Sequence, residues 1–302
     1  MPVSRRLLLA TPVALAAAGR ALAAEPITVA YAGSMGALMN KGMNPAFTKA
    51  TGVSVHGIGQ GAVGLAHLIV GGAMRPDVFV PVSVDAAKIV LDAGKAEKAL
   101  PVASTSMVLA YSPVSKFAAQ FKEAKGSDWT KIFLNPDVKL GRTNPQVDPQ
   151  GRYVLFALQL AEIYYKLPGF AKKVTGGMIN PTQIFAEPSL LARLQAGQID
   201  ATLSYKSAVV SQKLPYIELP AEINLSDPTF TNTVYNLASL EVKGKDGQSK
   251  TIHPSPLVFY AMVLKAAAHP AAAAKYVSFL AGPQGQALFK AYGYGPGMGG
   301  DV

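Results

Sequence analysis

The organisation of the chain is first visible in the stretch Ile27-Thr28-Val29-Ala30-Tyr31-Ala32-Gly33-Ser34-Met35-Gly36. An apolar run of strand length ends in a small, polar turn, and a helix-like segment then extends to Thr51-Gly52. The same order recurs, with strands expected at 53–58 and 77–81 and helices at 63–70 and 84–93. Strand and helix alternating at this spacing predict parallel pairing, with helices on the faces of the sheet.

A second unit follows, with strands expected at 107–111, 138–141, 200–204 and 216–219. Its helices are expected at 114–123, 149–165 and 188–196. A strand at 257–264 precedes two last helices at 270–280 and 283–291. We interpret the strands near 107–111 and 257–264 as crossings between two lobes. The expected division is lobe 1 at 25–108 plus 262–302 and lobe 2 at 109–261, with a ligand cleft at the carboxyl ends of the strands.

The composition narrows the classes of function. Of 302 residues, 50% are hydrophobic and 15% are charged, which favours a well-filled core. The absence of cysteine excludes disulfides, thiolate metal sites and a cysteine nucleophile. The formal charge of +10 includes Arg5, Arg6 and Arg20, and the lysines are dispersed, so we expect no nucleic-acid binding.

Residues 1–24 have the pattern of an export signal. A basic start is followed by an apolar stretch, Leu7 to Ala18, and then by Ala21-Leu22-Ala23, where small residues suit signal peptidase. The apolar stretch is too short to span a bilayer. Ser4-Arg5-Arg6-Leu7-Leu8 also suits a twin-arginine signal, so export by the Sec or the twin-arginine route stays open. We expect a periplasmic protein.

Three junctions between a strand and a helix carry small or polar residues. At the first, Gly33 permits close backbone approach, and Ser34 either caps its helix or donates to an anion. At the second, residues 57–62 form either a flexible turn or an anion-binding loop. At the third, Asp148 before Pro149 is a strong helix start, and local evidence makes Asp148 a cap.

Enzymatic motifs are missing from the sequence. It contains no G-x-S-x-G, Walker loop or H-E-x-x-H. We therefore expect no enzymatic activity, no cofactor and no resident metal; an exported hydrolase on a similar fold is the less favoured alternative.

Longer motifs resemble a known family. The segments Gly141-Arg142-Thr143-Asn144-Pro145-Gln146-Val147-Asp148-Pro149-Gln150-Gly151-Arg152-Tyr153 and Ser204-Tyr205-Lys206-Ser207-Ala208 are similar to the periplasmic molybdate/tungstate-binding proteins, in their archaeal-type branch. Leu160 to Tyr165, Tyr216 to Pro220, Leu225-Ser226-Asp227-Pro228 and Gly282-Pro283-Gln284-Gly285 fit the same pattern. The resemblance covers nearly all of the chain after residue 24.

The resemblance implies a type II periplasmic-binding-protein fold: α/β, two-lobed, with mostly parallel sheets, helices on both faces and a cleft between the lobes. It implies a monomer that captures a small oxyanion for a membrane ABC permease, with molybdenum or tungsten present only in the bound anion. The runner-up is a binding protein for sulfate, a phosphonate or an organic acid. The implied ligand-binding residues are Gly33, Ser34, Gln60, Gly61, Ala62, Asp148, Pro149, Gln150, Ser204 and Tyr205.

Two positions depart from the family pattern. A Gly-Ser pair is usual where this chain has Gly61-Ala62, and Gln60 is the candidate replacement donor. The family's glutamate before Tyr-Lys/Arg-Ser is Ser204 here. Without that second carboxylate, a tetrahedral anion held by hydrogen bonds from Ser34, Ser204 and backbone amides is expected in place of a six-coordinate metal centre. A carboxylate at Asp148 would repel the anion unless it is protonated, bonds to the metal or caps its helix.

Overall fold

The strand β1 (Ile27–Ala32) lies inside a sheet covered on both faces, in a computed structural model that describes residues 25–146, 148–243 and 248–302. Alternate side chains of β1 enter different clusters: Val29 and Tyr31 pack on one face, and Ala30 packs on the other. The expected signal, residues 1–24, lies outside the described residues. Within them, no helix combines the length and apolar character needed to cross a membrane.

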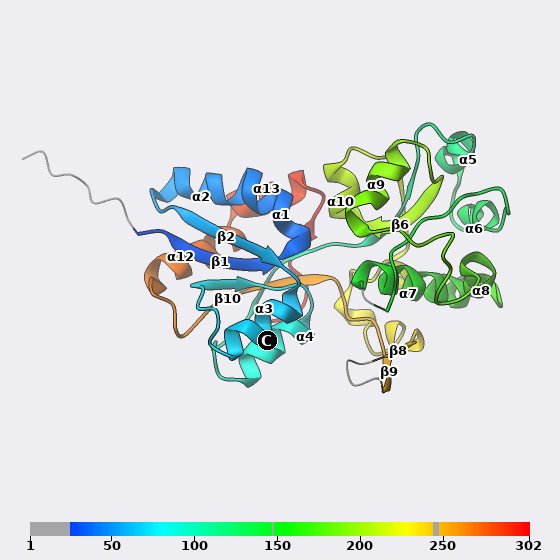
Figure 1. Ribbon diagram of the computed structural model, residues 1–302. Helices are drawn as coiled ribbons and strands as arrows, with labels where there is room; N and C mark the ends of the chain where they lie inside the picture. Colours follow the sequence, from blue (N-terminus) through cyan, green and yellow to red (C-terminus); the bar gives the residue numbers. More distant parts are fainter. Residues whose placement is uncertain (1–24, 147, 244–247) are drawn as a thin grey trace, which may run out of the picture.

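We call lobe 1 the six-stranded sheet and its helices (Figure 1). The strand order is β11-β4-β10-β3-β1-β2. Besides β1 the strands are β2 (Val55–Gln60), β3 (Val78–Val80), β4 (Leu100–Ser104), β10 (Val258–Val263) and β11 (Gly295–Pro296). One face carries a run of helical turns from η1 (Gly33–Met35) through α1 (Gly36–Leu38) and η2 (Met39–Met43) to α2 (Asn44–Thr51), with α12 (Pro270–Ala281) and α13 (Pro283–Ala291). The other carries α3 (Ala62–Val70) and α4 (Val84–Asp92).

We call lobe 2 the three-stranded sheet with the elements around it. Its strand order is β6-β5-β7, formed by β5 (Met107–Tyr111), β6 (Ala201–Tyr205) and β7 (Tyr216–Glu218). Its helices are α5 (Ala118–Glu123), α6 (Asp128–Phe133), α7 (Pro149–Tyr164), α8 (Phe170–Thr175), α9 (Glu187–Gln195), α10 (Lys206–Ser211) and α11 (Ala221–Asn224), followed by the short turns η3 (Pro228–Phe230) and η4 (Tyr235–Leu237). The hairpin of β8 (Leu240–Lys243) and β9 (Ser249–Ile252) completes the lobe.

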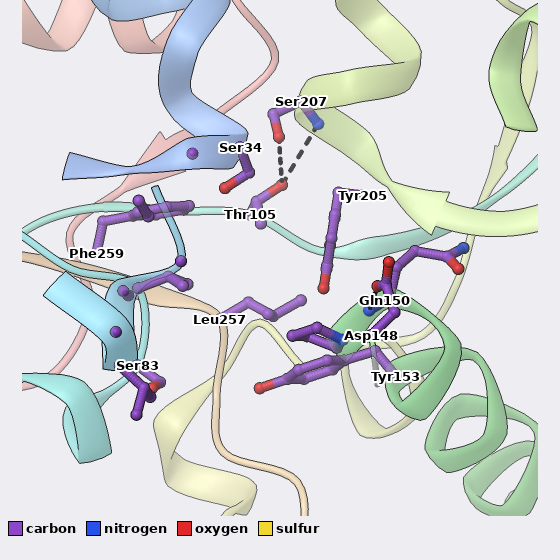
Figure 2. Close-up of a pocket in the computed structure, with 18 residues that line it drawn as sticks. Ser34, Ser83, Thr105, Asp148, Gln150, Tyr153, Tyr205, Ser207, Leu257 and Phe259 are labelled. Carbon is purple, nitrogen blue, oxygen red and sulfur yellow. Dashed lines mark hydrogen bonds between the residues drawn. The ribbon is translucent and has the colours of Figure 1, made fainter. Parts of the chain in front are cut away.

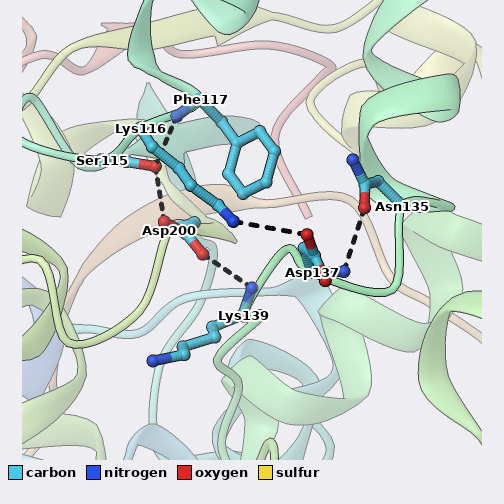
Figure 3. A network of polar contacts seen from close by, with 7 residues as sticks. All are labelled: Ser115, Lys116, Phe117, Asn135, Asp137, Lys139 and Asp200. Atoms are coloured by element: carbon cyan, nitrogen blue, oxygen red, sulfur yellow. Dashed lines mark hydrogen bonds and ion pairs between the residues drawn. The ribbon is translucent and has the colours of Figure 1, made fainter.

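A buried carboxylate ties the start of β6 to two loops. Asp200 is only 8% exposed, and it accepts hydrogen bonds from the Ser115 hydroxyl and from the Lys139 backbone N–H (Figure 3). Buried charges are stable only when such donors surround them. This network joins the loop after β5 to the segment 138–141, which forms an isolated bridge from Leu140 to Ala201 and not the strand predicted there.

The pairing is more mixed than the sequence predicted. The α/β class with helices on both faces is confirmed, but among the strand pairs of the described residues only β1–β2 and β1–β3 are parallel. In lobe 1, β10 runs antiparallel to β3 and β4, and β5 of lobe 2 runs antiparallel to β6 and β7, beside isolated parallel bridges at Leu140–Ala201 and Arg142–Ile184. The physical reason is that parallel neighbours need a crossover helix, whereas β4 and β10 join the sheet from the segments that pass between the lobes.

The two segments that pass between the lobes lie next to the strands β5 and β10, and not within those strands as the sequence predicted. Because β4 ends at Ser104 and β5 begins at Met107, the chain leaves lobe 1 at Thr105 and Ser106. It returns just before β10, near Leu257. We propose lobe boundaries at these two points, which moves 107–108 into lobe 2 and 258–261 into lobe 1 relative to the division expected above.

Candidate functional site

A cleft of about 370 Å³ has walls from both lobes and from both passing segments (Figure 2). Most of its walls come from the junctions at which strands meet helices and from the helix starts that follow, and the passing segments and β10 add Thr105, Leu257 and Phe259. The lining residues are Ala32, Gly33, Ser34, Gly61, Ala62, Val63, Gly64, Val82, Ser83, Thr105, Asp148, Pro149, Gln150, Tyr153, Tyr205, Ser207, Leu257 and Phe259.

Most of the residues predicted to bind a ligand meet in this cleft. Those that line it are Gly33, Ser34, Gly61, Ala62, Asp148, Pro149, Gln150 and Tyr205. The junctions at 33–34 and 61–62 converge because the carboxyl ends of the parallel strands β1 and β2 lie at one edge of the sheet.

Gln60 and Ser204 are outside the lining. Gln60 is the exposed last residue of β2. Ser204 is 3% exposed and pairs with Val108, which packs in the cluster of α9 and α10 residues. Because side chains alternate along a strand, Ser204 faces away from the side on which Tyr205 lies. The roles expected for these two side chains therefore lack support from the geometry.

The lobe 1 side of the cleft presents three helix N-termini. The 3-10 turn η1 begins after Ala32, α3 after Gly61 and α4 after Ser83, and none of these residues makes a side-chain capping hydrogen bond. First-turn N–H groups have no acceptor within their own helix, and the helix dipole places partial positive charge there. This wall is thus built of backbone donors suited to an anion.

The lobe 2 wall differs because its helix start is satisfied internally. Asp148 accepts a hydrogen bond from the Gln150 N–H at 2.8 Å, and the Thr143 hydroxyl accepts one from the Gly151 N–H at 2.7 Å. Pro149 has no N–H. The first turn of α7 therefore offers the cleft its dipole and the Asp148 carboxylate, and the backbone of Pro149 and Gln150, which the resemblance places against the ligand, has no free donor there.

The Gln150 side chain is likewise engaged within lobe 2. Its amide oxygen accepts from the Thr143 N–H at 3.0 Å, and its amide nitrogen donates to the Leu203 carbonyl at 2.7 Å. Gln150 is 2% exposed, so this pair of bonds fastens α7 to β6.

Four cleft residues with hydroxyl groups were missed by the sequence analysis: Ser83, Thr105, Tyr153 and Ser207. Ser83 follows the third strand at another strand-to-helix junction, so its position was a usable signal. Ser207 lies within the family-like segment 204–208. Thr105 had no local signal, because only the pairing of β4 and β5 with different sheets places it between the lobes.

The electrostatics of the cleft come from helix dipoles, from the Asp148 carboxylate in the lining, and from the Asp85 carboxylate in the first turn of α4. Among the described lining residues there is no Lys, Arg or His, and Asp148 is the single carboxylate. Burial, assisted by the nearby charge of Asp85, raises the pKa of Tyr153 well above its usual value, so its hydroxyl stays neutral. Among residues 25–146, 148–243 and 248–302, no group of three or more His, Cys, Asp or Glu side chains is placed to hold a metal ion.

Comparison with known proteins agrees with this architecture. The family described as bacterial extracellular solute-binding protein matches residues 27–295. The molybdate/tungstate-binding protein WtpA of Thermococcus kodakarensis is 32% identical over 207 residues, which cover 62% of this chain and 57% of that protein. The chain spans less than two thirds of the length of the curated relatives it matches first.

Solved structures share the fold at low sequence identity. The periplasmic molybdate-binding protein of Azotobacter vinelandii superposes with a TM-score of 0.59 at 16% identity, covering 89% of this chain and 98% of that one. The sulfate-binding protein SubI of Mycobacterium tuberculosis gives 0.56 at 14% identity, covering 90% and 86%. The type II periplasmic-binding-protein fold and the resemblance found in the sequence are thereby confirmed. The chain belongs to the bacterial extracellular solute-binding proteins.

Proposed function

We propose that this protein binds a small tetrahedral oxyanion, molybdate or tungstate, in the cleft and delivers it as a monomer to a membrane ABC permease. Export by the signal at residues 1–24 is part of the proposal. The named relative WtpA supports the choice of anion, and the family supports the role in capture.

The observation that carries the proposal is the convergence of three uncapped helix N-termini, those of η1, α3 and α4, on one cleft. Backbone N–H groups hold an oxyanion through charge-assisted hydrogen bonds without a neutralising side chain. The Ser34 and Ser83 hydroxyls add donors on the same wall. Apart from Asp148, the polar groups that line the cleft are neutral, and the neutral donors of the lobe 1 wall suit a compact anion with oxygens on all sides.

The geometry favours hydrogen bonding to the anion over coordination of its metal atom. Asp148 is the single carboxylate in the lining, and Ser204, where the family has glutamate, faces the other side of β6. The Asp148 carboxylate caps α7. Capping turns part of its charge toward the helix start and reduces the repulsion expected between a carboxylate and a dianion.

The test is isothermal titration of the purified protein, freed of anions by unfolding and refolding, with molybdate, tungstate, sulfate and phosphate. We expect micromolar or tighter binding of molybdate and tungstate and loss of about tenfold in affinity on Ser34→Ala, since a hydrogen bond to a charged group contributes about 1.5–3 kcal/mol. Ser226→Ala, a serine outside the cleft lining, is the matched control. Absence of heat with both metal oxyanions rejects the proposal.

A second candidate ligand is an organic or other small anion, such as a phosphonate or a carboxylate. It is favoured by the apolar part of the cleft, where Tyr153, Tyr205 and Leu257 lie opposite the donor wall (Figure 2). Thermal-shift screening separates the candidates, because a ligand raises the unfolding temperature in proportion to the logarithm of its concentration over Kd. A larger shift with phosphonates or carboxylates than with molybdate selects this alternative.

A further inference from the structure

Tyr294 lies just behind the cleft, in the segment that follows α13. It is 6% exposed, and it is not among the residues that line the cleft. Its ring packs edge-on against Phe259 at 5.4 Å and against Phe289 at 5.7 Å between centroids. These contacts with lobe 1 residues fix the orientation of the ring and so the position of its hydroxyl.

The Tyr294 hydroxyl lies where lobe 1 meets lobe 2. It donates to the Ser34 carbonyl at 3.3 Å, in the first loop of the donor wall. Burial raises the pKa of Tyr294 to about 12, and a hydrogen bond with the Ser207 side chain of lobe 2 opposes part of that rise. A neutral hydroxyl between a carbonyl and a second hydroxyl donates to one and accepts from the other.

The chain of hydroxyls continues from Ser207 to the passing segment. The Thr105 hydroxyl donates to the Ser207 hydroxyl at 3.3 Å, and the Ser207 backbone N–H approaches the Thr105 oxygen at 3.4 Å (Figure 2). Thr105 and Ser207 are 4% and 3% exposed and line the cleft. Thr105 with Ser207 and Tyr294 with Ser34 thus form two hydrogen-bonded pairs. The effect of the Ser207 side chain on the pKa of Tyr294 places the two pairs side by side, and together we call them one series.

The residue before Tyr294 brings lobe 2 within contact distance of this series. Gly293 has φ +80°, and a Cβ there would lie 2.7 Å from the Cβ of Val210 on α10. Only glycine permits both the backbone conformation and the close approach. The contact fixes α10, with Ser207 in its first turn, against the C-terminal segment of lobe 1.

We propose that Tyr294 is a positioning residue that couples the anion-binding loop at Ser34 to the closure of lobe 2 through Ser207. This inference rests on the proposed function. When the lobes approach, the series is complete, and the hydrogen bond to the Ser34 carbonyl holds the loop that carries Ser34 at the donor wall. When the lobes separate, Ser207 leaves Tyr294, and the Ser34 peptide loses its support. Anion binding and lobe closure therefore stabilise each other.

The test uses Tyr294→Phe, which keeps both aromatic contacts and removes the hydroxyl. We expect its Kd for molybdate or tungstate to rise about tenfold, a rise of the same size in Ser207→Ala, and a double variant that is no weaker than either single one. Tyr276→Phe is the matched control: Tyr276 lies in the same lobe 1 cluster, and its buried hydroxyl donates to Asn44 at 2.6 Å, away from the cleft. It should lower the unfolding temperature and leave the Kd unchanged.

A second readout keeps the inference independent of the ligand. Small-angle scattering of the anion-free protein should show a larger radius of gyration for Tyr294→Phe than for the parent chain and Tyr276→Phe. If no oxyanion binds the parent chain, the proposed function fails, and the scattering alone decides the coupling. Unchanged scattering, an unchanged Kd or full additivity in the double variant overturns the role of Tyr294.

Discussion

The carboxylate of Asp148 accepts a hydrogen bond from the backbone N–H of Gln150 at 2.8 Å while the same residue lines the cleft. The Asp148 side chain therefore both caps α7 and faces the cleft. Repulsion of an anion by this carboxylate is the largest unfavourable electrostatic effect among the described lining residues, because none of the others carries a full charge at neutral pH.

Asp148→Asn should separate the two roles. Asparagine caps a helix about as well as aspartate but carries no charge, so we expect stability within about 0.5 kcal/mol of the parent and anion affinity raised severalfold. Titration calorimetry measures the affinity. Asp148→Ala is the companion variant, and loss of the cap should lower the unfolding free energy by about 1 kcal/mol. Weaker binding in Asp148→Asn would show that the carboxylate bonds to the metal of the anion.

Ala62→Ser introduces a hydroxyl into the first turn of α3, where the family resemblance places serine. Ala62 is 8% exposed and lines the cleft beside the uncapped N-terminus. A new donor on the lobe 1 wall should tighten molybdate binding by about three- to tenfold. Ala66→Ser, one turn further into the buried face of the same helix, should lower stability without this gain. Equal affinities for Ala62→Ser and the parent would place the anion away from α3.

Ser83 holds a backbone conformation that favours glycine. Its φ of 70° and ψ of 149° lie in a region that costs a non-glycine residue about 1–3 kcal/mol. We expect Ser83→Gly to raise the unfolding temperature and to weaken anion binding through loss of the hydroxyl. Ser83→Ala keeps the strain and removes the same hydroxyl, so it should weaken binding to the same degree without the gain in stability. If Ser83→Gly lowered the free energy of unfolding, the backbone of Ser83 would not be strained.

Gly151 is the position at which α7 meets the preceding loop most closely. A Cβ there would lie 2.3 Å from the Thr143 carbonyl oxygen and 2.9 Å from the Pro145 nitrogen, which are backbone atoms. Gly151→Ala should therefore destabilise the fold by about 3 kcal/mol and displace Asp148. Gly36→Ala, where a Cβ meets nothing within 4 Å, should be neutral or stabilising. Urea unfolding compares the stabilities of the Gly151→Ala and Gly36→Ala variants. Equal midpoints would show that a Cβ at position 151 does not clash with the backbone of Thr143 and Pro145.

Stability should fall at alkaline pH because buried tyrosines resist ionisation. Burial raises the pKa of Tyr235 and of Tyr294 to about 12, from 10 in the unfolded chain. Between pH 10 and 12 the unfolded state binds fewer protons than the native state, so the free energy of unfolding decreases as pH rises through this range. Urea unfolding at pH 9, 10 and 11 measures the slope. Tyr294→Phe should reduce it, and an unchanged slope would show that Tyr294 does not contribute.

Local sequence pattern predicted most of the longer helices and strands and eight of the residues that line the candidate site, but it missed β4, β8 and β9. The apolar run 27–31 and the junctions at 33–34, 61–62 and 148–150 are read from neighbouring residues, because strand and helix periods and helix-start preferences act over a few positions. The strands at 107–111, 201–205 and 216–218 were located within one or two residues for the same reason.

The tertiary structure decided which side chains face the cleft and which distant residues meet. Register on β6 turns Ser204 away from Tyr205's face, and internal hydrogen bonds occupy the donors of Gln150. The bonded residues Thr105 and Ser207 are 102 positions apart, and Ser34 and Tyr294 are 260 apart. No local preference specifies which distant hydroxyls meet. Their meeting depends on how two sheets, each stabilised by burial of its own faces, bring the passing segments together.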